Sequence, residues 1–537
     1  MDARSRLTQM RAAQRLAAKD AALFSDPVVA ADRLGWIGLP RTAAEDTAAL
    51  EAFASEVAAD GITDVVLLGM GGSSLAPLVL SRVFGHAADR PALHVLDTTS
   101  PEQVLALLAA LAPETTLVIV SSKSGTTIEP LSLAVVFRGW MEAALADTAS
   151  THFVAITDPG SPLERDARAT GFARVFHAPA DVGGRYAALT PFATVPAALT
   201  GVGLARLAAS AVSAETACAV DDADNPGAAL AAWLSDACAC GRDKLTLVMS
   251  EPYAAFGLWV EQLVAESTGK RGAGLLPVLE AAPGDPAAHG EDRMTFVLRT
   301  SDDALLAGLA SRLPEGEPVF ETVLGDRSDL GGEFVRWEWA VALFSVLRCI
   351  EPFDQPNVAE AKAASEAILR GGAGGPAPAR IEVNAAGLAA ADVEALAPAL
   401  GGMLAGGGAG SYLAVLAYLP DDPELLAPLR DACSALASSR GIPVTLELGP
   451  RYLHSTGQYH KGGPRTGLFV VVTAGNREDL RIPGASYTLG VLNRAQAAGD
   501  VATLSAHGRP VIHVALPDPG RANVVAVADA LRAVADS

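Results

Sequence analysis

Cysteines and long apolar runs are both scarce in this sequence. Five cysteines in 537 residues are too few for a disulfide-rich scaffold, and Cys238 and Cys240 lack the second pair of ligands that a zinc knuckle needs. We find no run of about 18 or more uncharged apolar residues, which a transmembrane helix requires. We therefore expect a cytoplasmic protein with reduced thiols and no membrane association.

Positive charge is also in short supply. The chain has 40 Lys and Arg against 61 Asp and Glu, a formal net charge of −21. This balance argues against nucleic acid, whose affinity comes mainly from Lys and Arg on phosphates, and against anionic membrane surfaces. An anionic ligand must therefore be held locally, by backbone N–H groups and one or two cations. The histidines show no metal-ligand spacing, so we expect no metal and no cofactor.

Short apolar runs alternate with helical stretches along most of the chain. Residues 64–69, 93–96, 117–120 and 153–156 are typical of buried parallel strands, as are 245–249, 295–298, 413–418, 444–448, 468–472 and 511–514. This alternation predicts an α/β fold with parallel sheets. We expect N-terminal helices over 1–55, α/β domains over 56–205 and 206–370, a Gly/Ala-rich linker over 371–393, and a C-terminal α/β region over 394–537.

Two strand-to-helix turns are candidate anion sites. The first expected strand ends in Gly69-Met-Gly-Gly-Ser-Ser-Leu75, and a glycine-rich turn before a helix exposes N–H groups to an anion. The third ends in Ser121-Ser-Lys-Ser-Gly-Thr-Thr127, where five hydroxyls surround one cation. Ligands bind at the carboxyl ends of strands in open α/β sheets, so the two turns together predict a phosphate site.

These two turns resemble the sugar-isomerase (SIS) fold of the phosphoglucose isomerase family. Gly183-Gly-Arg-Tyr186 is similar to that family's G-G-R-[FY] turn, and Gln262 to Lys270 to its Q-x-x-x-E-S-x-G-K signature. Phe353 to Lys362 resembles its F-D-Q-x-x-V-E-x-x-K helix. The resemblance covers roughly residues 60–370 and implies two SIS-type, doubly wound domains with helices on both faces. The region 394–537 is similar instead to the isomerase half of bifunctional transaldolase/phosphoglucose isomerases.

The resemblance implies a glucose-6-phosphate to fructose-6-phosphate isomerase and gives roles to particular residues. Glu266 becomes the base at C2, Arg185 stabilises the enediolate, and Lys362 pairs with the ring oxygen or the O1 hydroxyl. The expected substrate-binding residues are Gly72, Ser73, Ser122, Lys123, Ser124, Thr126, Thr127 and Gln262. The family is usually dimeric, so we expect a homodimer that binds a hexose 6-phosphate, with a possible association with a transaldolase.

The sequence leaves three candidates for the histidine that opens the sugar ring. His289 follows Glu266 in the family's order, but its surroundings lack the G-x-x-G-Q-H motif of the family. That motif is echoed downstream in Thr456-Gly-Gln-Tyr-His460, so His454 and His460 are the alternatives. We favour His289.

Other functions fit less well. A non-catalytic SIS-type sugar-phosphate sensor is the main alternative, since it needs the phosphate loops but not Glu266, Arg185 and Lys362 together. A dinucleotide-dependent dehydrogenase requires glycine where Ser74 stands in the G-x-G-x-x-G pattern. A metal-dependent sugar isomerase needs a ligand cluster that we do not find in the sequence.

Overall fold

Three separate parallel sheets form the framework of the protein. The computed structural model describes residues 2–280, 289–370 and 395–537. The first sheet has the order β2-β1-β3-β4-β5, the second β7-β6-β8-β9 and the third β11-β10-β12-β13, with all neighbours parallel. Every apolar run predicted as a strand lies in one of these sheets, and the α/β fold class is confirmed.

The strands are short, as expected for buried parallel sheets. The first sheet contains β1 (Asp64–Leu68), β2 (Ala92–Leu96), β3 (Thr116–Ser121), β4 (Phe153–Thr157) and β5 (Arg174–His177). The second contains β6 (Lys244–Met249), β7 (Leu276–Glu280), β8 (Arg293–Thr300) and β9 (Val319–Leu324). The third contains β10 (Tyr412–Tyr418), β11 (Val444–Leu448), β12 (Gly467–Ala474) and β13 (Val511–Leu516).

Helices connect the strands and cover the sheets. Four of them precede the first strand: α1 (Ala3–Met10), α2 (Ala12–Ala17), α3 (Pro27–Ala31) and α4 (Leu39–Ala59). The first unit adds α5 (Leu75–Phe84), α6 (Pro101–Ala110), α7 (Ile128–Leu145), α8 (Pro162–Thr170) and α9 (Pro191–Leu199). The second adds α10 (Leu204–Cys218), α11 (Pro226–Ala239), α12 (Phe256–Thr268), α13 (Ala304–Ala307), α14 (Leu330–Arg348) and α15 (Pro356–Arg370). The third adds α16 (Leu396–Ala405), α17 (Pro423–Arg440), α18 (Gly457–Gly462), α19 (Leu489–Ala506) and α20 (Arg521–Ala535).

Burial on both faces explains the uninterrupted apolar strands. In β1 all four residues of Val65–Leu68 are fully buried, and they divide between two hydrophobic clusters, one on each face of the sheet. A parallel strand covered by helices on both sides has no solvent face to carry polar side chains. The ranges 56–205 and 206–370 each contain one sheet, whereas the predicted linker over 371–393 lies outside the described residues.

The strand order of the first sheet shows where a ligand can bind. β1 and β3 are neighbours, and the chain leaves them toward opposite edges of the sheet. This is the topological switch point of a doubly wound sheet, where a crevice opens outside the carboxyl ends of the strands. The turns that begin at Gly69 and Ser121 flank this point.

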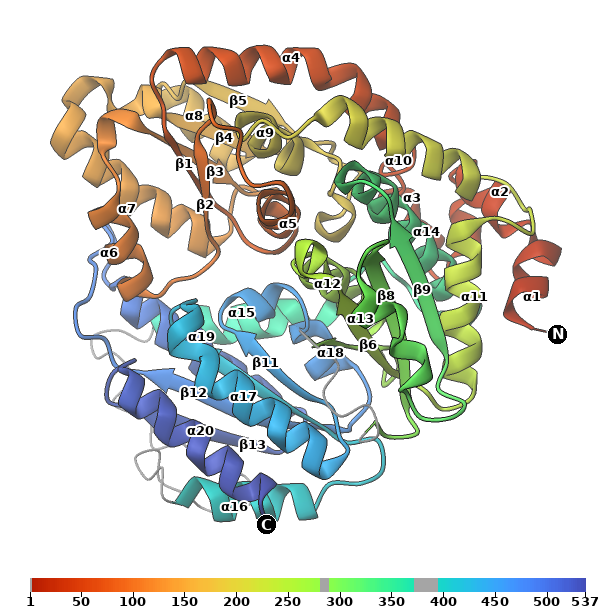
Figure 1. Cartoon of the computed structure of the whole chain (residues 1–537). Helices are drawn as coiled ribbons and strands as arrows, with labels where there is room; N and C mark the ends of the chain where they lie inside the picture. The colour runs from red at the N-terminus through yellow and green to blue at the C-terminus, as the bar shows by residue number, and fades with distance from the viewer. Residues whose placement is uncertain (1, 281–288, 371–394) are drawn as a thin grey trace.

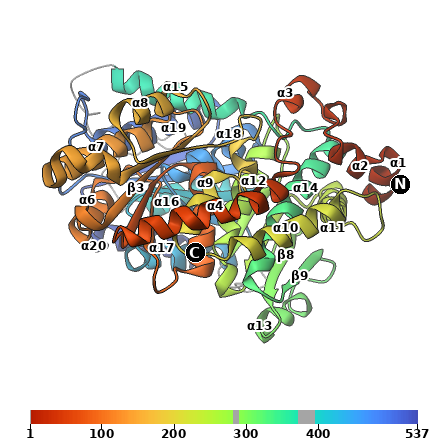
Figure 2. The ribbon, with the colours of Figure 1, turned by 90° about the horizontal axis from the view of Figure 1, so that it is seen from above.

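The three units meet around a common junction (Figure 1). The first unit lies at the upper left of the view, the second at the right and the third at the lower left. Helix α12 of the second unit contacts both α5 of the first and α18 of the third, and α15 packs against α18 and α19. Seen from above, α4 runs along the first unit toward α10, which it contacts (Figure 2). No helix in the described part of the chain is long and apolar enough to cross a membrane.

Candidate functional site

The first predicted loop makes two close backbone contacts. It continues from β1 into a short 3-10 turn, Gly71–Ser73. A Cβ atom on Gly72 would lie 2.0 Å from the carbonyl oxygen of Gly184, and one on Gly71, whose φ is +53°, would lie 2.8 Å from Nε2 of Gln262. Only glycine fits such approaches. The loop is therefore pressed against both the turn that carries Arg185 and the helix that carries Glu266.

The second loop is joined to the first. Ser121 Oγ donates a hydrogen bond of 2.9 Å to the carbonyl of Ser73, and Ser122 Oγ donates one of 3.1 Å to Thr127 Oγ1. Ser124 and Thr126 lie exposed at the tip, with their hydroxyls 2.8 Å apart. The two loops thus form one continuous rim at the switch point, and this rim carries hydroxyl groups of the kind that bind phosphate.

Lys123 does not offer a free cation to this rim. Its ammonium lies 2.7 and 2.9 Å from the two carboxylate oxygens of Asp158 and also donates to the carbonyls of Pro179 and Ala180. This differs from the expectation that Lys123 binds the substrate. The physical reason is that an ammonium that has lost part of its hydration needs a charge partner, and Asp158 is the carboxylate within reach. Lys123 ties the second loop to the segments after β4 and β5.

A buried ion pair lies beside the first loop. Nε of Arg185 is 3.2 Å from Oε2 of Glu266, and the two side chains are only 4% and 7% exposed. Arg185 comes from the 3-10 turn Gly184–Tyr186 and Glu266 from the last turn of α12. Burial raises the pKa of Glu266 because it penalises the charged form, and the positive charge of Arg185 opposes that shift. A carboxylate so placed has a stronger affinity for a proton than one in water.

Two polar atoms next to this pair have no partner. Within the described residues, Nη1 of Arg185 and Oε1 of Gln262 are buried without a hydrogen bond. Arg185 is only 4% exposed and Gln262 only 3%. Buried polar groups in proteins are nearly always satisfied, so unpartnered ones call for a ligand or water. One donor and one acceptor beside Glu266 match the hydroxyl groups of a sugar.

The third unit supplies a histidine to the same place. His454 ends the 3-10 turn Arg451–His454, and its carbonyl accepts a 2.9 Å hydrogen bond from Nε2 of Gln262. Its ring nitrogen Nε2 lies 3.0 Å from Oε1 of Glu129, which also accepts from Gln496 Nε2 at 2.6 Å. Burial alone would raise the pKa of Glu129, but the charge of His454 and these hydrogen bonds outweigh it and hold that pKa below its usual value. A carboxylate so held orients the imidazole.

The other two candidate histidines lie in separate networks. His289 contacts Glu317 at 3.1 Å and Glu280 at 3.6 Å, and these carboxylates raise its pKa to about 9 although burial acts in the opposite direction. His460 is buried between Glu447 and the hydroxyl of Tyr412, each at 2.9 Å. Each ring therefore has partners in its own unit. The structure thus brings His454, rather than the favoured His289, to Glu266.

Other predicted features fall partly outside the described residues. Lys362 belongs to α15, and its side chain lies outside the part of the chain that the structure describes. In the described residues, no group of three or more His, Cys, Asp and Glu side chains is arranged to hold a metal ion.

Sequence reasoning assigned no role to three residues of this cluster: Glu129, Gln496 and Lys270. Glu129 lies in the first turn of helix α7, shortly after the hydroxyl-rich loop, and this position is the local signal that it lies near the site. Gln496 stands in the middle of α19 and offers no signal, because its contact with Glu129 spans 367 positions. Lys270 closes the Q-x-x-x-E-S-x-G-K segment, and its buried ammonium lies near Arg185 and Glu266.

Comparisons with known proteins agree with this geometry. The family model described as phosphoglucose isomerase matches residues 50–271. A glucose-6-phosphate isomerase of Rubrobacter xylanophilus is 33% identical over 273 residues, which cover 49% of this chain and 62% of that protein. The chain spans less than two thirds of the length of the first curated relatives that it matches.

Two solved structures share the fold. A hypothetical protein of Thermus thermophilus is 27% identical with a TM-score of 0.59, and the match covers 68% of this chain and 96% of that one. A glucose-6-phosphate isomerase of Chlamydia trachomatis is 20% identical with a TM-score of 0.54, over 61% of this chain and 73% of that one. At that identity the second likeness bears on the fold alone.

Proposed function

We propose that the chain, whose residues 50–271 match the phosphoglucose isomerase family model, interconverts glucose 6-phosphate and fructose 6-phosphate. One observation carries the proposal. The buried Arg185–Glu266 pair, with two unpartnered polar atoms beside it, adjoins a rim of hydroxyls at the switch point of the first sheet. A binding site for a phosphate needs the rim, but it does not need a buried carboxylate with a raised pKa.

Glu266 is the base that moves the proton between the two sugar carbons. Aldose–ketose isomerisation takes a proton from C2, passes through an enediolate and returns a proton to C1. A general base acts best when its pKa approaches the working pH, and burial shifts the pKa of Glu266 in that direction. Arg185 stabilises the negative charge that develops on the enediolate oxygens without losing its own proton. Gln262 positions the substrate hydroxyls.

His454 is the ring-opening acid and base. Opening a cyclic sugar phosphate requires a proton to leave the anomeric hydroxyl and another to reach the ring oxygen. Because Glu129 accepts at Nε2, that nitrogen carries a proton in the neutral ring and Nδ1 holds the lone pair. The ring can therefore gain and lose a proton at Nδ1 while Glu129 keeps its orientation. Lys362 retains the role that the family resemblance implies, next to the ring oxygen or O1.

The phosphate is held by the two loops rather than by a cation from Lys123. The hydroxyls of Ser73, Ser122, Ser124, Thr126 and Thr127, with nearby backbone N–H groups, are the proposed anchors. Neutral O–H and N–H donors can hold a dianion without a cation, because each hydrogen bond to the charged phosphate is charge-assisted. This suits a chain in which cations are scarce.

A coupled assay tests the proposal directly. Purified protein is incubated with fructose 6-phosphate, and glucose 6-phosphate is measured through a reporter dehydrogenase, with and without EDTA. We expect turnover that EDTA leaves unchanged, because proton transfer between carbons needs no metal. Binding of the substrate without turnover would support the sugar-phosphate sensor instead, and activity abolished by EDTA would support a metal-dependent isomerase.

The phosphate loops give a first specific prediction. Replacing Ser122 and Thr127 together with alanine is expected to raise KM for fructose 6-phosphate by about 10-fold or more, with kcat within about 3-fold of the parent. Anchor contacts form equally in the ground and transition states, so their loss weakens binding without slowing chemistry. The control is Thr148→Ala with Thr151→Ala, in the turn that follows α7. An unchanged KM in the first double variant would remove this loop from the site.

The partners of the protein are also proposals. We propose a cytoplasmic homodimer, as the family resemblance implies, with a possible association with a transaldolase. Sedimentation equilibrium of the full chain tests the first point, and co-sedimentation with a purified transaldolase tests the second.

A further inference from the structure

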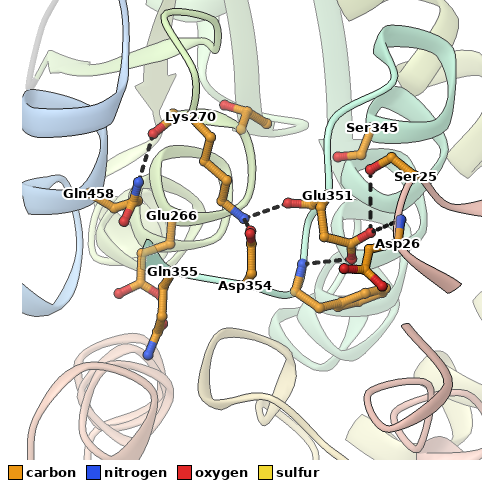
Figure 3. Close-up of polar contacts among 12 residues, drawn as sticks. Ser25, Asp26, Glu266, Lys270, Ser345, Glu351, Asp354, Gln355 and Gln458 are labelled. Carbon is orange, nitrogen blue, oxygen red and sulfur yellow. Dashed lines mark hydrogen bonds and ion pairs between the residues drawn. The ribbon is translucent and has the colours of Figure 1, made fainter. Parts of the chain in front are cut away.

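Lys270 is a buried cation in the turn after α12, and the mechanism above does not use it. The side chain is 3% exposed. Its ammonium donates to the carbonyl of Glu351 and lies 2.6 Å from Oδ1 of Asp354 (Figure 3). Burial and the charge of Arg185 lower the pKa of Lys270 to about 7, although Asp354 and Glu351 oppose the shift. An isolated structural lysine gains little from such a position, because removing an ammonium from water is costly.

The turn over residues 351–355, which contains Glu351 and Asp354, also binds Arg185. Nη2 of Arg185 donates to the carbonyl of Asp354 at 3.2 Å and to Oε1 of Gln355 at 2.9 Å. Asp354 therefore binds Lys270 through its carboxylate and Arg185 through its carbonyl. The turn over 351–355 has two fixed points, and one of them is the guanidinium that contacts Glu266.

The turn after α12 and the turn over residues 351–355 each make hydrogen bonds to segments distant in the sequence. Gln458 of α18 donates to the carbonyl of Gly269 at 3.0 Å and accepts from the backbone N–H of Asn357 at 3.0 Å. On the other side, the carboxylate of Glu351 accepts from the backbone N–H of Asp26 at 3.0 Å, as Figure 3 shows. Lys270 thus links the turn that Gln458 contacts to the turn that Asp26 contacts.

We propose that Lys270 is a positioning residue, whose ammonium fixes the 351–355 turn and through it the guanidinium of Arg185 against Glu266. The inference rests on the proposed isomerase function and deepens it. The charged groups that face this ammonium are Asp354, Arg185, Glu351 and Glu266. Catalytic groups need placement within a fraction of an ångström, so a support of this kind affects the rate without touching the substrate.

A double-mutant cycle tests whether Lys270 acts through Arg185. Lys270→Met alone is expected to lower kcat by about 10²-fold, the effect of a misplacement of about 1 Å, with KM within about 3-fold. In an Arg185→Ala background the same change is expected to cost less than about 3-fold, because the group it positions is gone. If Lys270→Met lowers kcat by the same factor in the Arg185→Ala background as in the parent, the proposal is wrong.

Two further measurements separate positioning from simple loss of structure. Removing a positive charge near Glu266 raises the pKa of that carboxyl, so the acid limb of kcat/KM is expected to move to higher pH in Lys270→Met. That variant is also expected to bind a pentonate 5-phosphate, which carries a carboxylate where the enediolate forms, at least about 10-fold more weakly. Binding of an uncharged hexitol 6-phosphate is expected to change by less than about 3-fold.

The controls keep the two proposals distinguishable. Lys270→Arg retains the charge and is expected to keep the acid limb of kcat/KM in place. If Lys270→Met does not fold, Asp354→Asn replaces it in the cycle, because it removes the charge partner and leaves the backbone carbonyl that Arg185 uses. A parent protein without isomerase activity refutes the proposed function. A parent with activity, combined with an additive cycle or an unmoved pH profile, refutes only the role of Lys270.

Discussion

Glu266→Gln is expected to lower kcat by about 10²–10⁴-fold, the usual contribution of a positioned general base. Glutamine keeps the shape of the side chain and can still bond to Arg185, but it cannot take a proton from C2. The measurement is kcat for fructose 6-phosphate, from which the base takes the C1 proton, together with exchange of the C2 proton of glucose 6-phosphate for deuterium from solvent. Both are expected to fall together, while binding of a hexitol 6-phosphate is retained.

Helix α12 offers a matched control for this experiment. Glu261 lies on the same helix and accepts a hydrogen bond of 3.0 Å from Ser455 Oγ. Burial raises the pKa of Glu261, and the nearby charge of Glu447 raises it further. Glu261→Gln therefore replaces an acid already inclined to stay protonated with a neutral amide, and kcat is expected to stay within about 3-fold. Persistent C2 exchange in Glu266→Gln would mean that another group is the base.

His454→Ala is expected to lower kcat for cyclic fructose 6-phosphate by about 10²-fold, because a positioned acid–base group for ring opening is lost. Turnover of a tetrose 4-phosphate is expected to fall much less. In that sugar the hydroxyl needed to close a ring is esterified, so the molecule is open-chain and needs no ring opening. The measurement is the ratio of the two rates in parent and variant.

His289→Ala is the comparison for this test. It leaves the carboxylates of Glu280 and Glu317 without their shared partner, so we expect a lower midpoint of thermal unfolding. The ratio of cyclic to open-chain turnover is expected to stay at the parent value. The selective loss appearing in His289→Ala and not in His454→Ala would contradict the assignment and return the role to the second unit.

Local patterns predicted the fold well where the strands are apolar throughout. β5, β7 and β9 were missed, and each is an edge or peripheral strand with polar or exposed positions. Edge position alone does not explain these misses, because β2, β11 and β13 are also edge strands and were predicted. The order of strands within the sheets, by contrast, depends on crossover connections that no local pattern encodes.

The site was predictable only in part for a similar reason. Arg185, Glu266 and Gln262 lie in motifs with a family resemblance, and the structure brings them together. Chain order favours His289 among the three candidate histidines, whereas the packing of the third unit against α12 brings the alternative His454 next to Gln262. Lys123 looked like a free cation because its partner Asp158 is 35 positions away. Contacts of this kind are set by tertiary packing.

The contact between Glu129 and Gln496 has a consequence for biosynthesis. The two residues are 367 positions apart, and at about 5–20 residues per second a ribosome makes them roughly 20–70 s apart. The first sheet can form from the early part of the chain, but Glu129 lacks its partners His454 and Gln496 until the third unit has emerged. Contacts of such high sequence separation form late and slowly. We therefore expect the proposed site to be complete only after the third unit has been made and has packed against α12.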